Sequence, residues 1–254
     1  MLVIAYTLCG LTQEGDKLIA FNGIARWMEE NVEAAMTCGM WEQYIVRELQ
    51  WEVCNQNNRV EAPLVQEWRA PSWSWASGDH HLTKYTFTGS HGRVCPQSSE
   101  TAEVTSLNAE TLPTGKVVSA TLTLRGEATR VTVRIEKYDW KKGLPAVVVS
   151  AISEYRIDSR CFVFDRLPAF PYEEELTLVA LSKCHCVVDD YWPETDGIHS
   201  GAEYPRPVLA VLMLRRLPTT SVSYSRVGML RLAGDECQMY DENKSSHAEE
   251  LVLV

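Results

Sequence analysis

The sequence predicts an α+β protein in which N-terminal helices pack on a β-rich antiparallel barrel or sandwich. Residues 11–51 carry apolar side chains largely at spacings of three and four, which is the period of an amphipathic helix. Residues 103–232 instead contain short alternating or β-branched runs with no helical pattern between them, which favours antiparallel pairing. We expect a single domain over residues 1–254, with a mainly helical part (1–68), a β-rich part (69–234) and an acidic, polar tail (235–254).

The helical part is expected to hold an entry strand and two helices. Residues 1–6 are apolar, carry no basic leader and are too short for a secretory signal, which predicts a strand. The first helix follows residue 11, with Thr12 or Asp16 available as its cap and one apolar stripe facing a core. A second helix is expected over residues 40–51, where the aromatic side chains favour packing over a cofactor site.

Eight strands are expected in the β-rich part. The continuous apolar runs at residues 146–149 and 208–214 are typical of strands that are covered on both faces. Residues 189–207 form a long irregular loop of a kind that often caps a cavity. The eight strands are placed near residues 103–107, 117–125, 129–138, 146–152, 160–165, 176–188, 208–214 and 226–232. The acidic tail that follows them is expected to be mobile, and its apolar end is expected to add an edge strand.

Charge and composition exclude several classes of protein. The formal net charge of −10, without clustered Lys and Arg, argues against binding of nucleic acid or of an anionic membrane surface. No apolar run approaches the roughly 18 residues that a membrane-spanning helix requires. We therefore expect a cytoplasmic protein that does not insert into membranes. Its eight Cys are scattered through the chain, which is typical of reduced thiols.

Residues 69–77, Arg-Ala-Pro-Ser-Trp-Ser-Trp-Ala-Ser, are the most informative stretch and are called the Trp-rich segment below. If this segment is extended, Trp73 and Trp75 point to one side, because side chains alternate across a strand. The small residues between them point to the other side and can lie close to neighbouring backbone. The pattern favours an aromatic wall with a polar, titratable rim.

Motifs for common metal and cofactor sites are missing from the sequence. It has no Gly-rich phosphate loop, no Gly-x-Ser-x-Gly elbow and no His-Glu-x-x-His helix. In a strand, Cys184 and Cys186 face one side and His185 the other, and no second Cys or His pair follows at zinc spacing. We therefore expect core thiols rather than a metal site, and no cofactor.

Candidate catalytic residues flank the Trp-rich segment. Asp79 can orient His80 as a general base. Alternatively, these residues are polar only because the loop is exposed to solvent, and they have no function. Arg69 can clamp a carboxylate or stack on an indole, or it can simply pin the loop. The expected catalytic residues are Asp79, His80 and Arg69. The expected substrate-binding residues are aromatic: Trp41, Trp73, Trp75, Tyr85, Tyr191 and Trp192.

Several motifs resemble the region that follows the heterokaryon-incompatibility domain of filamentous-fungal proteins. They are Leu11-Thr12, Asp16-Lys-Leu-Ile-Ala, Gly23-Ile-Ala-Arg, Gly39-Met-Trp, Leu49-Gln-Trp and the Trp-rich segment, followed by Ala120-Thr-Leu-Thr-Leu-Arg-Gly and Tyr224-Ser-Arg-Val-Gly-Met-Leu. The resemblance implies a fungal source and an α+β fold with a β-rich C-terminal half. It brings no catalytic motif. The incompatibility domain itself, which is tied to a cell-death response, has no counterpart in these residues, so that activity is not transferred.

Two functions remain open. The first is a cofactor-independent enzyme of fungal specialised metabolism, which holds an apolar, terpenoid- or polyketide-like molecule in an aromatic pocket. It would act as a cyclase, isomerase or lyase and promote cyclisation, isomerisation, dehydration or a pericyclic step of Diels–Alder type, because orientation alone removes several kcal/mol of barrier. The alternative is a non-catalytic interaction or regulatory module derived from heterokaryon-incompatibility proteins. A cavity at Trp73 and Trp75 would favour the enzyme, and a filled core there would argue against it.

Overall fold

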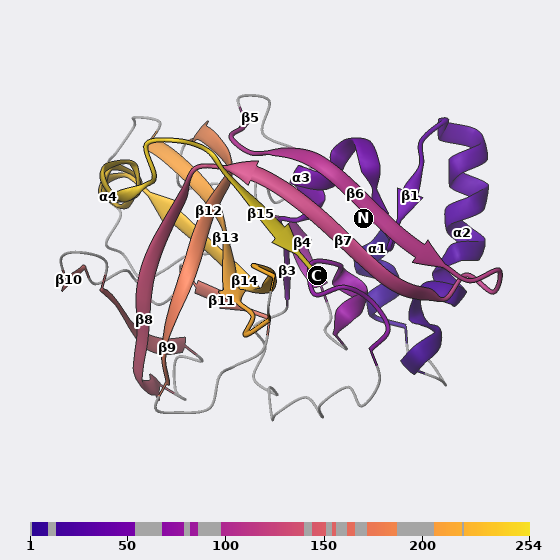
Figure 1. Ribbon diagram of the computed structural model, residues 1–254, viewed down its shortest axis with the longest axis horizontal. Coiled ribbons are helices and arrows are strands. Elements are labelled where there is room, and N and C mark those ends of the chain that lie inside the picture. The colour runs from indigo at the N-terminus through magenta and orange to yellow at the C-terminus, as the bar shows by residue number, and fades with distance from the viewer. Residues whose placement is uncertain are drawn as a thin grey trace.

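The computed structural model describes most of the chain and shows an α+β protein (Figure 1). The N-terminal helices lie at one end of a large β-sheet, and a further helix near the C-terminus lies at the other end. Among the described residues, no helix is long and apolar enough to cross a membrane. The described residues are 2–9, 14–53, 68–78, 82–85, 98–139, 144–150, 154–155, 162–165, 172–186, 206–219 and 221–254.

The first element is a helix, α1 (Leu2–Thr7), which corrects the strand that was expected at residues 1–6. The hydroxyl of Tyr6 donates a hydrogen bond of 2.8 Å to the carbonyl of Lys17. The Tyr6 ring also meets Phe21 edge-on, with 5.1 Å between ring centroids. A short apolar run has no period that separates a strand from a helical turn, so tertiary contacts of this kind decide its structure.

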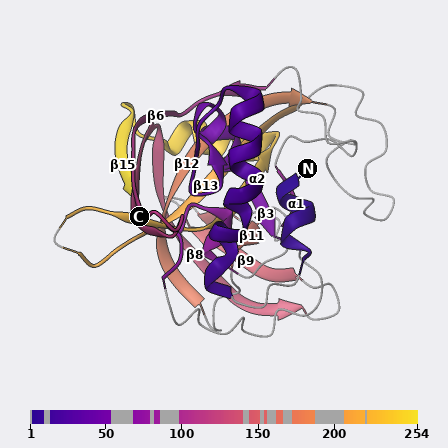
Figure 2. The same ribbon diagram turned by 90° about the vertical axis from the view of Figure 1, so that its right-hand side faces the viewer.

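The first expected helix is confirmed as α2 (Lys17–Val32), which follows the 3₁₀ turn η1 (Glu14–Asp16). Its buried residues Leu18, Phe21 and Ala25 recur at spacings of three and four and belong to the larger hydrophobic core. Figure 2 shows α1 and α2 in front of strands of the sheet. The strand residues Leu122 and Leu212 belong to the same core, so α2 packs against the sheet.

Shorter elements largely replace the second expected helix, at residues 40–51. The chain turns at Cys38 and Gly39, whose φ angles are 52° and 80°, and only four residues are then α-helical. Trp51 lies in a strand opposite Tyr85, and this long-range pairing outweighs the local helical pattern. The elements are β1 (Met36–Thr37), β2 (Met40–Trp41), η2 (Glu42–Tyr44), α3 (Ile45–Glu48), β3 (Trp51–Val53) and β4 (Leu82–Tyr85).

The described parts of all eight expected strand regions are strands of one sheet. Its main path runs β10-β9-β8-β12-β13-β14-β15-β7-β6, with β11 also paired to β14 and β5 to β12. The strands are β5 (Ser99–Glu100), β6 (Glu103–Thr111), β7 (Val117–Gly126), β8 (Ala128–Asp139), β9 (Leu144–Ser150), β10 (Glu154–Tyr155), β11 (Phe162–Phe164), β12 (Tyr172–Cys186), β13 (Arg206–Arg216), β14 (Tyr224–Ala233) and β15 (Glu249–Leu253).

The architecture of the sheet differs from the barrel or sandwich that was expected. In the described part of the chain the path is open between β10 and β6, so no closed barrel forms. β14 and β15 run parallel, whereas the other pairs are antiparallel, so the sheet is mixed. Helices and the small β3–β4 sheet cover its faces, and the apolar surface is therefore buried without a closed barrel.

Strand β13 separates two hydrophobic cores. Val208, Ala210, Leu212 and Leu214 belong to the larger core, which also contains the buried residues of α2 and α3. The alternate residues of the same strand, Leu209, Val211 and Met213, belong to a second core with Cys237 and Tyr240. All seven strand residues are buried, which confirms the expectation that this run is covered on both faces.

The C-terminal tail is ordered rather than mobile as expected. Its polar residues form a helix, α4 (Asp235–Asn243), because Cys237 and Tyr240 anchor it in the second core. The Tyr240 hydroxyl accepts a hydrogen bond of 2.9 Å from the amide of Ala180 and donates one of 2.7 Å to the carbonyl of Glu127. The apolar end forms β15 as a strand, but between β14 and β7 rather than at an edge.

Candidate functional site

The Trp-rich segment is a turn followed by a 3₁₀ helix, η3 (Trp75–Ser77), and not the extended strand that was considered. The amide of Ser74 donates a hydrogen bond of 2.9 Å to the carbonyl of Pro71. The Ser74 hydroxyl then accepts a bond of 3.1 Å from the amide of Ala76 and caps the helix. Ser side chains compete in this way with strand pairing, which explains why the alternating pattern did not give a strand.

Trp75 is a core residue, with 1% of its surface exposed. Its indole N–H donates a hydrogen bond of 2.8 Å to the carbonyl of Gly39. The rings of Phe21 and Tyr6 pack edge-on against it, at centroid distances of 5.2 Å and 5.8 Å. The Lys17 ammonium lies 5.4 Å from the ring centroid. The ring is thus enclosed by protein atoms and does not line a described cleft, so the structure gives no support to its expected role in substrate binding.

Trp73 is also in the core, with no exposed surface, so the two indoles fill the interior instead of forming a pocket wall. Its carbonyl accepts a hydrogen bond of 3.0 Å from the indole N–H of Trp51. Arg69 is buried and donates from Nε to the carbonyl of Ala76 at 2.7 Å. This bond holds the Trp-rich segment in place, which is the structural role considered above for Arg69. These contacts argue against the aromatic active site.

The remaining sequence candidates do not form a site in the described structure. Trp41 is half-buried in β2 and is not among the residues that line the described cleft; its amide donates a hydrogen bond of 2.7 Å to Glu48. Tyr85 lies in β4, but its side chain lies outside the described part of the structure. Asp79, His80, Tyr191 and Trp192 also lie outside the described residues.

A cleft of about 860 Å³ borders the Trp-rich segment. It is lined by Ser72 and Ser77 of this segment, by Trp68 just before it and by residues of β7, β11, β12, β13 and β14. Much of the lining is apolar, including Val118, Phe164, Leu217 and Val227. Ligand sites in proteins are typically concave and of roughly 300–1,000 Å³, so the cleft is the candidate functional site.

A buried ion pair between Arg226 and Asp165 forms part of the cleft wall. Arg226 donates from Nε to Asp165 at 2.8 Å and from Nη2 to its second carboxylate oxygen at 3.2 Å. The same guanidinium donates to the carbonyls of Leu49 and Trp51 and lies 3.4 Å above the Trp51 ring centroid. The Arg226 side chain is fully buried, and these partners satisfy its charge. The pair therefore serves as a rigid part of the wall.

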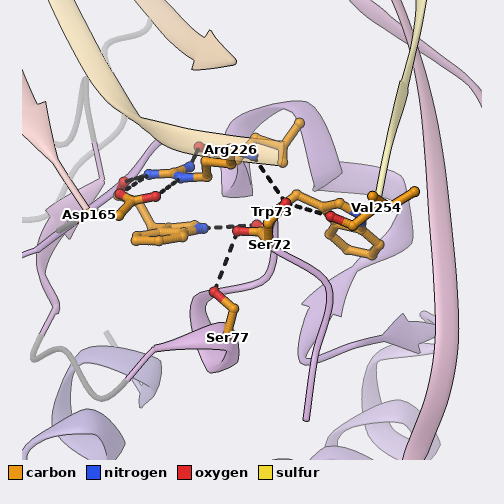
Figure 3. A network of polar contacts seen from close by, with 8 residues as sticks. Ser72, Trp73, Ser77, Asp165, Arg226 and Val254 are labelled. Atoms are coloured by element: carbon orange, nitrogen blue, oxygen red, sulfur yellow. Dashed lines mark hydrogen bonds and ion pairs between the residues drawn. The ribbon is translucent and has the colours of Figure 1, made fainter. Parts of the chain in front are cut away.

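Ser72 joins this pair to the end of the last strand (Figure 3). Its amide donates a bond of 3.1 Å to the carbonyl of Val254, and its hydroxyl donates to the same oxygen. The hydroxyl accepts a bond of 3.0 Å from the amide of Arg226, while the Ser77 hydroxyl donates to the Ser72 carbonyl at 3.4 Å. The cleft wall is thus held by hydrogen bonds between segments that are far apart in the sequence.

A second ion pair joins Arg215, the remaining charged side chain of the described lining, to Glu174. Arg215 donates from Nε and Nη2 to the two carboxylate oxygens of Glu174, and the Tyr172 hydroxyl donates to the same carboxylate. Burial works against the charge of Glu174, but the bonds from Arg215 and Tyr172 outweigh it and lower the pKa of Glu174. Burial and the bond to Glu174 raise the pKa of Tyr172. The network therefore keeps Glu174 charged and Tyr172 protonated.

Motifs that carry the resemblance meet around the Trp-rich segment. Lys17 donates from Nζ to the carbonyl of Gly78 at 2.7 Å. Gly39 accepts the bond from Trp75, and its φ of 80° with a close approach to that ring leaves no room for a β-carbon. Arg226, from the last motif, bonds the carbonyls of Leu49 and Trp51. These stretches are therefore one packed unit rather than separate sites.

The Cys-His-Cys stretch lies in β12, as expected for a strand. Cys184 is fully buried and disulfide-bonded, which corrects the expectation that all the thiols are reduced. Disulfides are rare in cytosolic proteins, so this bond does not favour the expected compartment. Among the described residues, no group of three or more His, Cys, Asp or Glu side chains is placed to hold a metal ion.

The charged residues of the described cleft lining are all paired. Asp165 is bonded to Arg226 and Arg215 to Glu174, so the described lining offers no unpaired carboxylate side chain as a base. Sequence reasoning missed these residues, although an Arg inside an apolar strand run such as Arg226 is a signal for a paired buried charge. Comparison with family models, curated proteins and solved structures finds no match to this chain.

Proposed function

We propose that the protein is a non-catalytic binding module that holds a mainly apolar small molecule in the cleft beside the Trp-rich segment. The observation that carries this proposal is the cleft itself, with a volume of about 860 Å³ and walls that include Val118, Phe164 and Val227. A concave, largely apolar surface with a few polar groups is the usual form of a small-molecule site.

The rigidity of the cleft supports binding. Ser72, Val254 and Arg226 are tied together by hydrogen bonds across three segments, so this part of the wall has little freedom left to lose when a ligand enters. Ordering of side chains is one of the main costs of association, and a preformed site avoids it. We therefore expect ligand binding with little movement of the strands.

The paired charges favour a binding role over a catalytic one. A general base must be free to take a proton, whereas Asp165 and Glu174 are each held by an arginine. The indoles of the expected active site fill the core. A non-catalytic role also agrees with the alternative that the resemblance suggested, an interaction or regulatory module derived from heterokaryon-incompatibility proteins.

A second candidate function is the cofactor-independent isomerisation or cyclisation of a terpenoid- or polyketide-like molecule. Two observations favour it: the volume of the cleft suits such a substrate, and Asp79 and His80 directly follow Gly78, which lines the cleft, in the sequence. Catalysis would then come from orientation of the substrate and one proton-transferring group.

Titration with N-phenyl-1-naphthylamine, an uncharged fluorescent apolar molecule, tests the binding proposal. We expect saturable binding to the unaltered protein and at least about tenfold weaker binding to Val118→Trp, whose indole occupies space in the cleft. Leu112→Trp is the matched control, because Val118 and Leu112 have nearly equal exposure, 44% and 45%, and Leu112 is outside the lining. Absence of binding, or equal binding to both variants, would overturn the proposal.

Turnover separates the two candidate functions. The protein is incubated with acyclic terpenoid alcohols and conjugated polyenes, and the mixture is analysed by liquid chromatography and mass spectrometry for isomers of unchanged mass. The binding proposal expects no isomer above the rate without protein. An isomer that disappears in His80→Ala would replace it with the enzymatic function.

A further inference from the structure

We infer that the ligand of the cleft is an uncharged, planar molecule, aromatic or conjugated, that stacks on Trp68. This inference rests on the proposed binding function and names the class of ligand. It comes from three features of the lining: the half-exposed indole of Trp68, the pairing of the charged side chains, and a guanidinium nitrogen of Arg215 that has no acceptor among the described residues.

Trp68 is the aromatic platform. It lies directly before the buried residues Arg69 and Ala70, yet 49% of its surface is exposed and it lines the cleft. In the part of the chain that the structure describes, no ring packs on its indole, in contrast to Trp75, which Phe21 and Tyr6 enclose. An exposed indole beside a cavity offers its π-face to a flat ligand, and stacked rings attract each other beyond the effect of buried area.

Each charged side chain of the described lining is paired with an opposite charge, which favours an uncharged ligand. Arg226 is matched by Asp165, and Arg215 by Glu174. An ionic ligand would have to break one of these pairs or give up its hydration without a partner, and both are costly in a partly enclosed site. A neutral molecule leaves the two pairs intact.

Arg215 supplies a directional hydrogen bond. It lines the cleft, and 45% of its side chain is exposed. Its Nε and Nη2 are directed to Glu174, and no described residue accepts a bond from its Nη1. A guanidinium carries five N–H donors, so Nη1 is available to a carbonyl or hydroxyl oxygen of the ligand. A flat, neutral ligand that carries such an oxygen can therefore gain a hydrogen bond from Arg215 in addition to stacking.

Two probes test the charge of the ligand. N-phenyl-1-naphthylamine and 8-anilinonaphthalene-1-sulfonate share the same rings, and only the second carries a sulfonate. We expect the uncharged probe to bind the unaltered protein at least about tenfold more tightly than the sulfonate. Equal or tighter binding of the sulfonate would overturn the assignment of a neutral ligand.

Substitution of Trp68 tests the stacking contact. We expect Trp68→Ala to weaken binding of the uncharged probe about tenfold and Trp68→Phe to retain much of it. Trp27→Ala is the matched control, because Trp27 is 66% exposed on α2 and is not part of the described lining, and it should bind like the unaltered protein. Far-ultraviolet circular dichroism checks the folding of each variant.

The outcomes separate the inference from the function on which it rests. If the probe does not bind the unaltered protein, the proposed function fails. If the probe binds and Val118→Trp abolishes binding while Trp68→Ala does not weaken it, the function stands and the stacking role is overturned. Should Trp68→Ala fail to fold, Trp68→Leu and Trp68→Phe give the same comparison, since loss with Leu and retention with Phe is expected only for a ring contact.

Discussion

The guanidinium of Arg226 lies over the indole of Trp51, with 3.4 Å between its central carbon and the ring centroid. The contact joins strand β14 of the sheet to strand β3 of the N-terminal part. Arg226 also bonds two carbonyls in that part and the carboxylate of Asp165. One side chain therefore links the helical layer, the sheet and the cleft wall.

Removal of this link should be strongly destabilising. We expect Arg226→Met to lower the free energy of unfolding by about 3–5 kcal/mol, because Asp165 and two carbonyls lose their buried partner. Arg125→Met is the matched control: the Arg125–Glu103 pair is exposed, and its loss should cost about 1 kcal/mol or less. Urea denaturation followed by circular dichroism measures both, and similar losses would show that Arg226 is not a structural hub.

Substitution of two glycines by alanine should change the stability of the protein in opposite directions. In Gly39→Ala the new β-carbon meets the Trp75 indole at 2.9 Å, at a φ of 80°, so we expect a loss of about 1–3 kcal/mol in stability. In Gly23→Ala the β-carbon enters open space within α2, and helix propensity predicts a gain of up to about 1 kcal/mol. Thermal midpoints of the two variants check the signs, and a stabilised Gly39→Ala would contradict the packing of Trp75.

Glu48 should make stability depend on pH. Burial raises the pKa of Glu48 to about 7, against a smaller opposing effect of the hydrogen bond from the Trp41 amide. Between the unfolded pKa of 4.5 and pH 7 only the unfolded chain loses the proton, so stability falls as pH rises. The full loss is at most about 3 kcal/mol, and it is smaller where water reaches this half-buried carboxylate.

Glu48→Gln isolates this effect, since the amide keeps an oxygen for the Trp41 amide and carries no charge. We expect the variant to match the unaltered protein below about pH 4.5 and to exceed it in stability above pH 7. Glu30→Gln, at an exposed position of α2, is the control and should follow the unaltered protein. Parallel pH profiles for Glu48→Gln and the unaltered protein would be inconsistent with the raised pKa.

The elements that could be predicted are those whose sequence shows a continuous apolar run or a clear helical period. The strand at residues 208–214 could be assigned from its apolar run, and α2 from the spacing of Leu18, Phe21 and Ala25. The strand expected at residues 1–6, the helix at 40–51 and the mobile tail were wrong, because contacts made by Tyr6, Trp51 and Tyr240 with distant residues decide those structures.

The candidate site was less accessible to sequence reasoning. A Trp-x-Trp pattern indicates two large side chains but not whether they face a cavity or a core. The cleft gathers Trp68, Asp165 and Arg215 from separate strands and turns, and no local spacing relates them. Pairing of β15 with both β14 and β7 also brings the β7 part of the lining to the sheet, and a periodicity of two does not specify strand order.

The position of β15 has a kinetic consequence. On the main path of the sheet, the β6–β7 hairpin is connected to β14 only through β15, with Leu251 opposite Leu124. All the strands from β8 to β14 lie between those partners in the sequence, so a long loop must close before the pairing forms. Pairings of such high sequence separation fold slowly. We therefore expect the hairpin to form early as a local unit and its pairing with β15 to form late in folding.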